Sequence, residues 1–138
     1  MPDKSASEML KELKELEKGF THVSVRDLTR MQNNNYPHPT CSSRFIGKAM
    51  LTVFSIRQKS WNNFYDLALE EPQKFLTRLK KFDKDKAGHL LPHLMKYVFD
   101  RDYPLETLIK KQTYLSGLAL WILSLYKYLQ LRQAFKSL

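Results

Sequence analysis

Residues 105–138 read LETLIKKQTYLSGLALWILSLYKYLQLRQAFKSL, and this stretch decides the fold class. It contains no proline and helix-forming residues dominate it, so we expect one long helix from Leu105 onward. Four apolar residues follow the spacing of a coiled-coil seam: Leu118, Ile122, Leu125 and Leu129. After a phase slip the apolar stripe continues through Leu131, Phe135 and Leu138. Trp121 lies in the uncharged part of the stretch and should be buried.

The start of the chain carries a matching pattern. Residues 7–20 read SEMLKELKELEKGF, and their apolar residues form a second heptad seam: Met9, Leu13, Leu16, Phe20 and Val23. Isolated helices shorter than ~12–15 residues are marginal in water, so this helix needs a partner. The C-terminal helix is the candidate partner. A chain that leaves along one helix and returns along the other makes an antiparallel pair.

Short predicted helices fill the segment between these two ends, and most begin at a residue that commonly caps or starts a helix. They are residues 25–32 after Ser24, 44–56 after Ser42 or Ser43, 61–69 after Ser60, 72–82 from Pro72, and 89–99, bent or broken near Pro92. The loop 33–40 and the turn 82–88 contain the clearest helix breakers. No segment alternates with a period of two residues, so we expect no sheet.

These patterns predict an all-α fold: a compact bundle of about six helices whose N- and C-terminal helices form the end of an antiparallel coiled-coil stalk. We divide the chain into a first stalk strand (1–22), a helical head (23–122) and a return strand (123–138). The return strand continues the last helix of the head.

The chain is strongly basic, with 23 Lys and Arg against 14 acidic residues and a net charge of +9. Such a surface attracts nucleic acid, an anionic membrane or an acidic protein, and charge alone does not choose among them. The single cysteine, Cys41, excludes an internal disulfide and a cysteine-based zinc site, which favours a reducing, intracellular setting.

Candidate catalytic and metal-binding motifs are weak. Residues 83–94 resemble a calcium loop, but Leu94 stands where a bidentate glutamate is required. His89 and His93 share a helical spacing without an evident third ligand. The four glycines stand singly, so there is no glycine-rich phosphate loop. We therefore expect no enzyme activity, no cofactor, no metal and no small-molecule substrate. The uncharged run 112–126 is too short for a bilayer and predicts a core helix, so we expect no membrane association.

Several landmarks follow one another in a fixed order: VRDLTRMQNNNYPHPT (25–40), FIGKAMLTVFSI (45–56), SWNNF (60–64), KFLTRLKKFDKD (74–85), LMKYVF (94–99) and YPLETLIKKQTYLSGLALWILSLYKY (103–128). This order, from about Phe20 to Tyr128, resembles the microtubule-binding domain at the stalk tip of dynein heavy chains. The last landmark is the best match, because Glu106, Lys110, Trp121 and Tyr128 keep the spacing of the family.

The resemblance implies that the chain binds microtubules, whose α/β-tubulin surface is acidic, and that the register of the stalk coiled coil controls the affinity. The ATPase motor would lie elsewhere in a full-length heavy chain, and no nucleic acid would be bound. The implied binding residues are Arg26, Arg30, Lys59, Glu106, Lys110 and Lys111. Glu106 and Lys110 are also spaced for a local ion pair on one helix. The implied location is the cytoplasm and its cytoskeleton, including the axoneme of a cilium or flagellum.

Some positions depart from the family. Pro37-His38-Pro39 replaces two adjacent prolines, Ser24 and Val25 stand where lysines are common, and no proline follows Tyr128. These departures indicate a divergent heavy chain, and both the cytoplasmic and the axonemal types stay open. An alternative from another class is a basic helical adaptor or nucleic-acid-binding module. Its terminal heptads would pair with helices of another chain, so it would form oligomers.

Overall fold

The computed structural model describes residues 6–136, and helices account for most of this range. Its α-helices are α1 (Ala6–Glu17), α2 (Val25–Asn34), α3 (Cys41–Val53), α4 (Trp61–Phe64), α5 (Pro72–Lys81), α6 (Leu91–Val98), α7 (Leu105–Lys110) and α8 (Ser116–Lys136). Shorter elements are the 3₁₀ turns η1 (Lys18–Thr21), η3 (Lys84–Lys86) and η4 (Gly88–Leu90), and the π-helical segment η2 (Tyr65–Leu69). No strand occurs in residues 6–136, so the all-α prediction is confirmed for this range. The ends of both predicted stalk strands, including Leu138, lie outside it.

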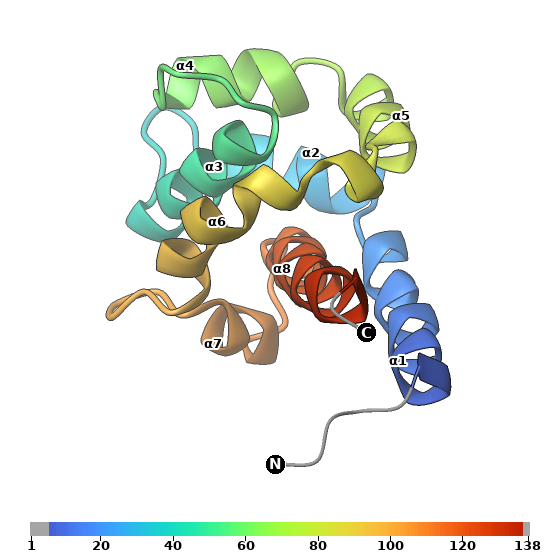
Figure 1. The fold of residues 1–138 in the computed structure, drawn as a ribbon. Helices are drawn as coiled ribbons and strands as arrows, with labels where there is room; N and C mark the ends of the chain where they lie inside the picture. Colours follow the sequence, from blue (N-terminus) through green and yellow to red (C-terminus); the bar gives the residue numbers. More distant parts are fainter. Residues whose placement is uncertain (1–5, 137–138) are drawn as a thin grey trace.

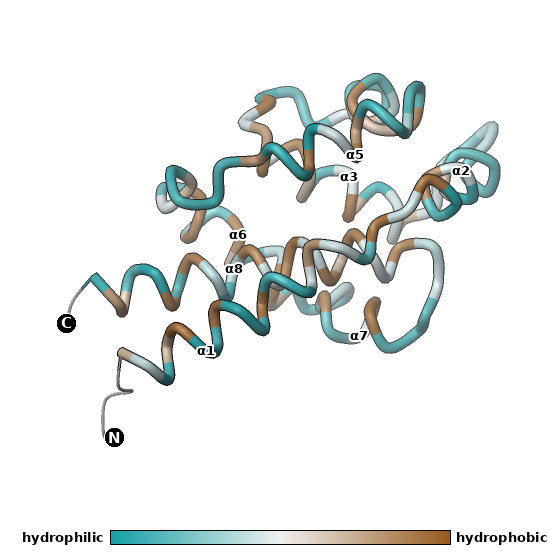
Figure 2. Tube along the Cα trace, turned by 90° about the vertical axis from the view of Figure 1, so that its right-hand side faces the viewer, coloured by the Kyte–Doolittle hydropathy of each residue, from teal (hydrophilic) through white to brown (hydrophobic). Residues whose placement is uncertain are grey.

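Helix α8 lies in the middle of the molecule and the other helices surround it. Helix α1 packs along one side of α8 and α7 packs along another, while α2 to α6 form the larger part of the head (Figure 1). Helices α1 and α8 run in opposite directions, and the start of α1 lies at the same end of the molecule as the end of α8 (Figure 2). The predicted antiparallel arrangement of the two terminal helices is therefore present.

The first two thirds of α8 are buried around almost the whole helix. From Gly117 to Leu129 only Leu120 and Lys127 are not buried, as expected for a helix that is apolar on all sides. Trp121 is 1% exposed, which confirms the prediction of its burial. The rings of Phe20 and Phe82 each meet its indole edge-on at a centroid distance of 5.5 Å. The core therefore joins α8 to the N-terminal segment and to the end of α5.

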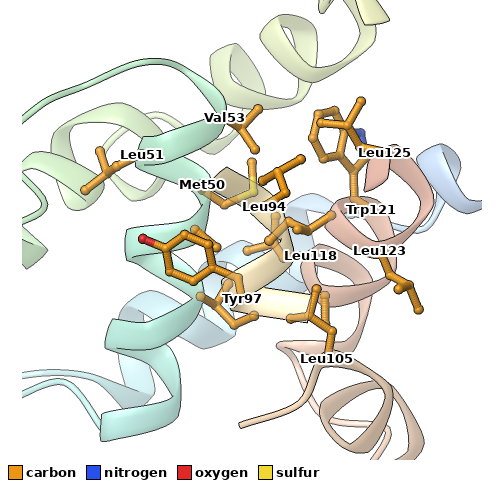
Figure 3. Packing of buried hydrophobic residues seen from close by; sticks show 14 of the residues in the cluster. Met50, Leu51, Val53, Leu94, Tyr97, Leu105, Leu118, Trp121, Leu123 and Leu125 are labelled. Atoms are coloured by element: carbon orange, nitrogen blue, oxygen red, sulfur yellow. The ribbon is translucent and has the colours of Figure 1, made fainter. Parts of the chain in front are cut away.

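Figure 3 shows the part of the core where four helices meet. The side chains labelled there come from α3, α6, α7 and α8: Met50, Leu51, Val53, Leu94, Tyr97, Leu105, Leu118, Trp121, Leu123 and Leu125. The same cluster extends to Met31 of α2, Phe64 of α4 and Phe75 of α5. Tyr97 keeps its hydroxyl satisfied inside this core through a contact of 3.1 Å with the hydroxyl of Thr52. No helix in residues 6–136 combines the length and the apolar character needed to cross a bilayer.

The first heptad seam is only partly regular. Met9 and Leu13 are buried, whereas α1 ends at Glu17 and the chain continues as the 3₁₀ turn η1. The turn brings the backbone of Gly19 against α8, where a Cβ atom would lie 1.9 Å from Ser124 Oγ. A second close approach follows at Gly117, where a Cβ atom would lie 2.8 Å from the carbonyl oxygen of His22. Glycine is required at both positions because the two backbones come so close.

The prediction of a single helix from Leu105 onward is wrong. Helix α7 ends at Lys110, Gln112 adopts a positive φ of 51°, and α8 begins at Ser116. Two hydroxyl side chains stabilise the break: Thr113 Oγ1 accepts from the amide of Leu115 and Ser116 Oγ accepts from the amide of Thr113. Ser116 Oγ also donates to the carbonyl oxygen of Leu108. Such side chains compete with helical backbone hydrogen bonds, and heptad spacing does not detect this competition.

Most predicted helix starts are confirmed. Ser24 and Ser60 cap α2 and α4, accepting hydrogen bonds from the amides of Asp27 and Asn63. Prolines occupy the first turns of α5 and α6. The predicted helix over 89–99 is interrupted near Pro92 as predicted, because its first residues form the 3₁₀ turn η4 and α6 begins only at Leu91. The prediction of Ser42 or Ser43 as a cap is wrong. Thr40 caps α3 instead, because its side-chain oxygen accepts from the amide of Ser43 and the helix begins earlier.

The two glycine contacts give a stability test. Replacement of Gly19 or Gly117 by alanine should lower the free energy of unfolding by about 1–3 kcal/mol, because the new methyl group forces η1 or the following residue His22 away from α8. Gly88→Ala is the matched control, since nothing lies within 4 Å of a Cβ atom there. Urea denaturation followed by circular dichroism measures all three variants. Equal stability of Gly19→Ala and Gly88→Ala would contradict the close packing of η1 on α8.

Candidate functional site

The two arginines predicted on the second helix are exposed. Arg26 and Arg30 lie one turn apart on α2, whose opposite face buries Leu28 and Met31 in the core. No ion pair involves either arginine within residues 6–136. Their charges are therefore available to a partner.

Helix α7 places its predicted residues in the same way. Glu106, Lys110 and Lys111 are exposed, while Leu105 and Leu108 are buried. The predicted local pair of Glu106 with Lys110 is not formed, and no ion pair joins them in the described range. Glu106 instead lines a hollow between α6, α7 and α8, whose other residues include Phe99, Tyr126 and Lys127.

The start of α2 and the end of α7 line one shallow groove of about 280 Å³, which we call the α2–α7 groove. Its lining includes His22 and Asp27 on one side and Ile109, Gln112 and Thr113 on the other. The structure therefore brings together two predicted segments that are about 80 residues apart in the sequence. Helix α8 supplies the other lining residues, Ser116, Gly117 and Leu120, while the exposed cations of α2 and α7 lie outside the lining.

A buried amide holds these segments together. Asn35, 4% exposed, follows α2, and its Nδ2 donates to the carbonyl oxygen of Met31 at 2.6 Å and to Tyr114 Oη at 3.2 Å. Its Oδ1 accepts from the amide of Thr40 at 2.8 Å. Tyr114 Oη also lies 3.3 Å from Ser43 Oγ. This network joins the end of α2, the start of α3 and the turn between α7 and α8.

Lys59, the predicted binding residue before α4, has a different environment. It is half-buried, and its Nζ donates to the carbonyl oxygens of Ile56 and Arg57, which follow the end of α3. Part of its hydrogen-bonding capacity therefore stabilises the chain between α3 and α4.

Helix α2 and the segment after α4 are in contact, because Gln32 Nε2 donates to Tyr65 Oη at 2.6 Å.

Lys59 also lines a hollow of about 370 Å³ that sequence reasoning missed. We call it the basic hollow, and its walls are formed by Pro37, Pro39, Arg44, Lys48, Lys59 and Trp61. Arg44 and Lys48 are exposed one turn apart on α3, whose other face is buried. Their spacing on the polar side of an amphipathic helix was the only signal in the sequence, and it did not indicate which segment faces them.

The head is attached to the terminal helices by a polar cluster. Tyr128 Oη donates to Asp85 Oδ1 at 2.9 Å, and Arg132 Nε lies 3.5 Å from the same oxygen. Lys84 Nζ lies 4.6 Å from the centroid of the Phe20 ring and 5.6 Å from that of Tyr128. Burial, together with the hydrogen bond to Asp85, raises the pKa of Tyr128 to about 12. Turn η3 thus contacts both the N-terminal segment and α8.

The described side chains offer little for metal chemistry. Within residues 6–136 no three His, Cys, Asp or Glu side chains gather closely enough to hold a metal ion. His89 and His93 are both exposed.

Together these features define a basic, all-helical module with an antiparallel helix pair at one end and two exposed groups of cations on the head. Comparison of the chain with protein-family models, with curated proteins and with solved structures finds no match.

The network around Asn35 can be tested with one hydroxyl. Tyr114→Phe should lower the free energy of unfolding by about 1–2 kcal/mol, because the buried amide of Asn35 loses a hydrogen-bond partner. Tyr36→Phe is the matched control, since Tyr36 is 85% exposed. Chemical denaturation of both variants measures the difference. The network would be unimportant for stability if the two variants unfold at the same denaturant concentration.

The cluster around Tyr128 predicts an alkaline dependence of stability. The folded state holds the Tyr128 proton up to a pKa of about 12, whereas a tyrosine of the unfolded chain loses it near pH ~10. The contribution of Tyr128 is therefore complete below pH ~10 and is lost as the pH rises toward about 12. Between these values the Tyr128→Phe variant should lose stability less steeply than the unsubstituted chain. Parallel slopes in urea titrations across this range would contradict the assignment.

Proposed function

We propose that this chain is the microtubule-binding tip of a dynein-type heavy chain, in which α1 and α8 form the adjoining end of an antiparallel coiled-coil stalk. The observation that carries the proposal is the arrangement of the two ends of the molecule. The termini of α1 and α8 lie together at one end, while α2 and the turn between α7 and α8 lie at the far end (Figure 2). A binding surface at the tip of a stalk requires this geometry.

The charges of the head support an acidic partner. Arg26, Arg30, Lys110 and Lys111 are exposed on the two helices that form the α2–α7 groove. The net charge of +9 would steer the domain toward the acidic tubulin surface. Contacts of this kind are screened by salt, with a Debye length of about 8 Å at physiological ionic strength. Binding is therefore expected to be electrostatic and salt-sensitive.

The packing of α1 favours this proposal over the adaptor alternative. An adaptor would keep its heptad residues free for another chain, whereas Met9 and Leu13 are buried within this chain, where α1 packs on α8. A monomer in light scattering is the expected result. An oligomer held together by α1 would favour the adaptor.

The connection between the helix pair and the head suggests how affinity is controlled. In the proposed function, a change in the register of α1 against α8 alters microtubule affinity. Only residues 22–24 separate η1 from α2, so a displacement of η1 is passed directly to the start of α2. Turn η3 is connected to α8 by the hydrogen bond that Tyr128 donates to Asp85. Both connections couple the stalk helices to the head.

Charge reversal on α7 tests the surface assignment. Lys110→Glu should weaken microtubule binding about five-fold or more, because it places like charges against an acidic surface. Lys14→Glu on α1 is the matched control, since it changes the net charge equally at an exposed position on the proposed stalk. Co-sedimentation with stabilised microtubules measures both variants, and circular dichroism checks their folding.

The same assay separates the proposal from its alternative. Binding of the unsubstituted chain to microtubules should fall steeply as salt is raised. Unchanged co-sedimentation of Lys110→Glu would remove α7 from the binding surface. Tighter binding to duplex DNA than to microtubules at matched salt would overturn the proposed function.

A further inference from the structure

The basic hollow has chemistry that the proposed surface on α2 and α7 does not use. Arg44 and Lys48 from α3 and Lys59 from the segment before α4 line it, and no Asp or Glu side chain does. Within residues 6–136 none of the three cations forms an ion pair. Like charges gathered without a counter-ion repel one another, so an anion bound among them is stabilised.

The remaining walls of the basic hollow combine the apolar side chains of Pro37, Pro39, Trp61 and Phe64 with the polar residues Ser60 and Asn62. Pro37 and Pro39 form one edge, and Trp61 lies half-buried with its ring 5.4 Å from that of Phe64. Gly47 packs on the same Phe64 ring: a Cβ atom added at Gly47 would lie 3.2 Å from Phe64 Cγ. An occupant that carries both negative charge and apolar stems would meet the cations and also cover these apolar surfaces.

The spacing of the cations suits an extended chain of alternating acidic side chains. Arg44 and Lys48 are four residues apart on α3, which corresponds to about 6 Å along a helix axis. In an extended peptide, side chains on the same face are separated by two residues, or about 6.6 Å. Two carboxylates at positions i and i+2 would therefore each meet one cation. The ammonium group of Lys59 has three N–H donors. Two of them are used by the carbonyl oxygens of Ile56 and Arg57, so one is left for the peptide.

Other anions match the basic hollow less well. Phosphate sites commonly use a cluster of backbone N–H groups, and two of the lining residues are prolines, which have none. Single-stranded nucleic acid needs open aromatic faces for stacking, whereas Trp61 packs on Phe64. We propose that the basic hollow binds an extended acidic peptide segment of a partner protein, with Arg44 and Lys48 holding successive carboxylates and Lys59 adding charge at the wall.

A labelled octaglutamate peptide added to the full chain tests this proposal. Fluorescence anisotropy should show salt-sensitive binding, and octaglutamine should not bind. Trp61 fluorescence should change on binding, and this change can be attributed to Trp61 because Trp121 is 1% exposed. The double variant Arg44→Gln/Lys48→Gln should bind the peptide about five-fold or more weakly, since two charge-assisted contacts are lost.

The matched control is Arg78→Gln/Lys80→Gln, which removes two exposed charges from α5. Peptide binding by this control should stay within about two-fold of that of the unsubstituted chain. Equal weakening by the two double variants, or none by Arg44→Gln/Lys48→Gln, would overturn the proposal. Stronger competition by inorganic phosphate or single-stranded DNA than by unlabelled octaglutamate would also overturn it. The assay contains no microtubules, so its failure is distinguishable from failure of the proposed function.

Discussion

Helix α8 is enclosed by the rest of the chain over most of its length, and this enclosure constrains every other element. A helix that is buried on nearly all sides requires apolar faces from its neighbours, and α1, α3, α6 and α7 supply them. Charged side chains are then excluded from the interior. Within residues 6–136 the buried polar residues are Asn35, Ser43, Thr52 and Ser124, none of which is charged. The core therefore leaves the charged side chains of this range at the surface, where the excess of Lys and Arg over Asp and Glu makes the net charge positive.

Apolar spacing and capping residues predicted much of this fold. The seam of Leu118 to Leu129, the burial of Trp121 and the caps at Ser24 and Ser60 are all indicated by residue types at short spacings along the sequence. The break between α7 and α8 was not predicted, because it depends on hydroxyl groups that form hydrogen bonds in a turn. The early start of α3 has a similar cause, since the side chain of Thr40 replaces a backbone hydrogen bond.

The candidate site was only partly accessible to sequence reasoning. The sequence predicts exposed cations on α2 and α7, but it does not show that the start of α2 and the end of α7 line a common groove. The basic hollow was missed because Arg44 and Lys48 line it together with Lys59 and Trp61, and spacing along α3 does not show which segment faces that helix. The hydrogen bonds of Lys59 to nearby carbonyl oxygens were missed for the same reason. Patterns along a helix predict which residues are exposed, whereas tertiary packing determines which exposed residues are neighbours.

Because Gly19 lies against α8, a displacement of the N-terminal segment along that helix would meet different residues in its two directions. Ser124 lies opposite Gly19, and the residues one heptad away on either side are Gly117 and Leu131. A one-heptad displacement in one sense would bring a second glycine opposite Gly19, where the backbones can stay in close contact. The opposite displacement would bring a leucine there, and its side chain would push the helices apart. Within the proposed function, residues 117, 124 and 131 would therefore make sliding of the N-terminal segment along α8 easier in one direction than in the other.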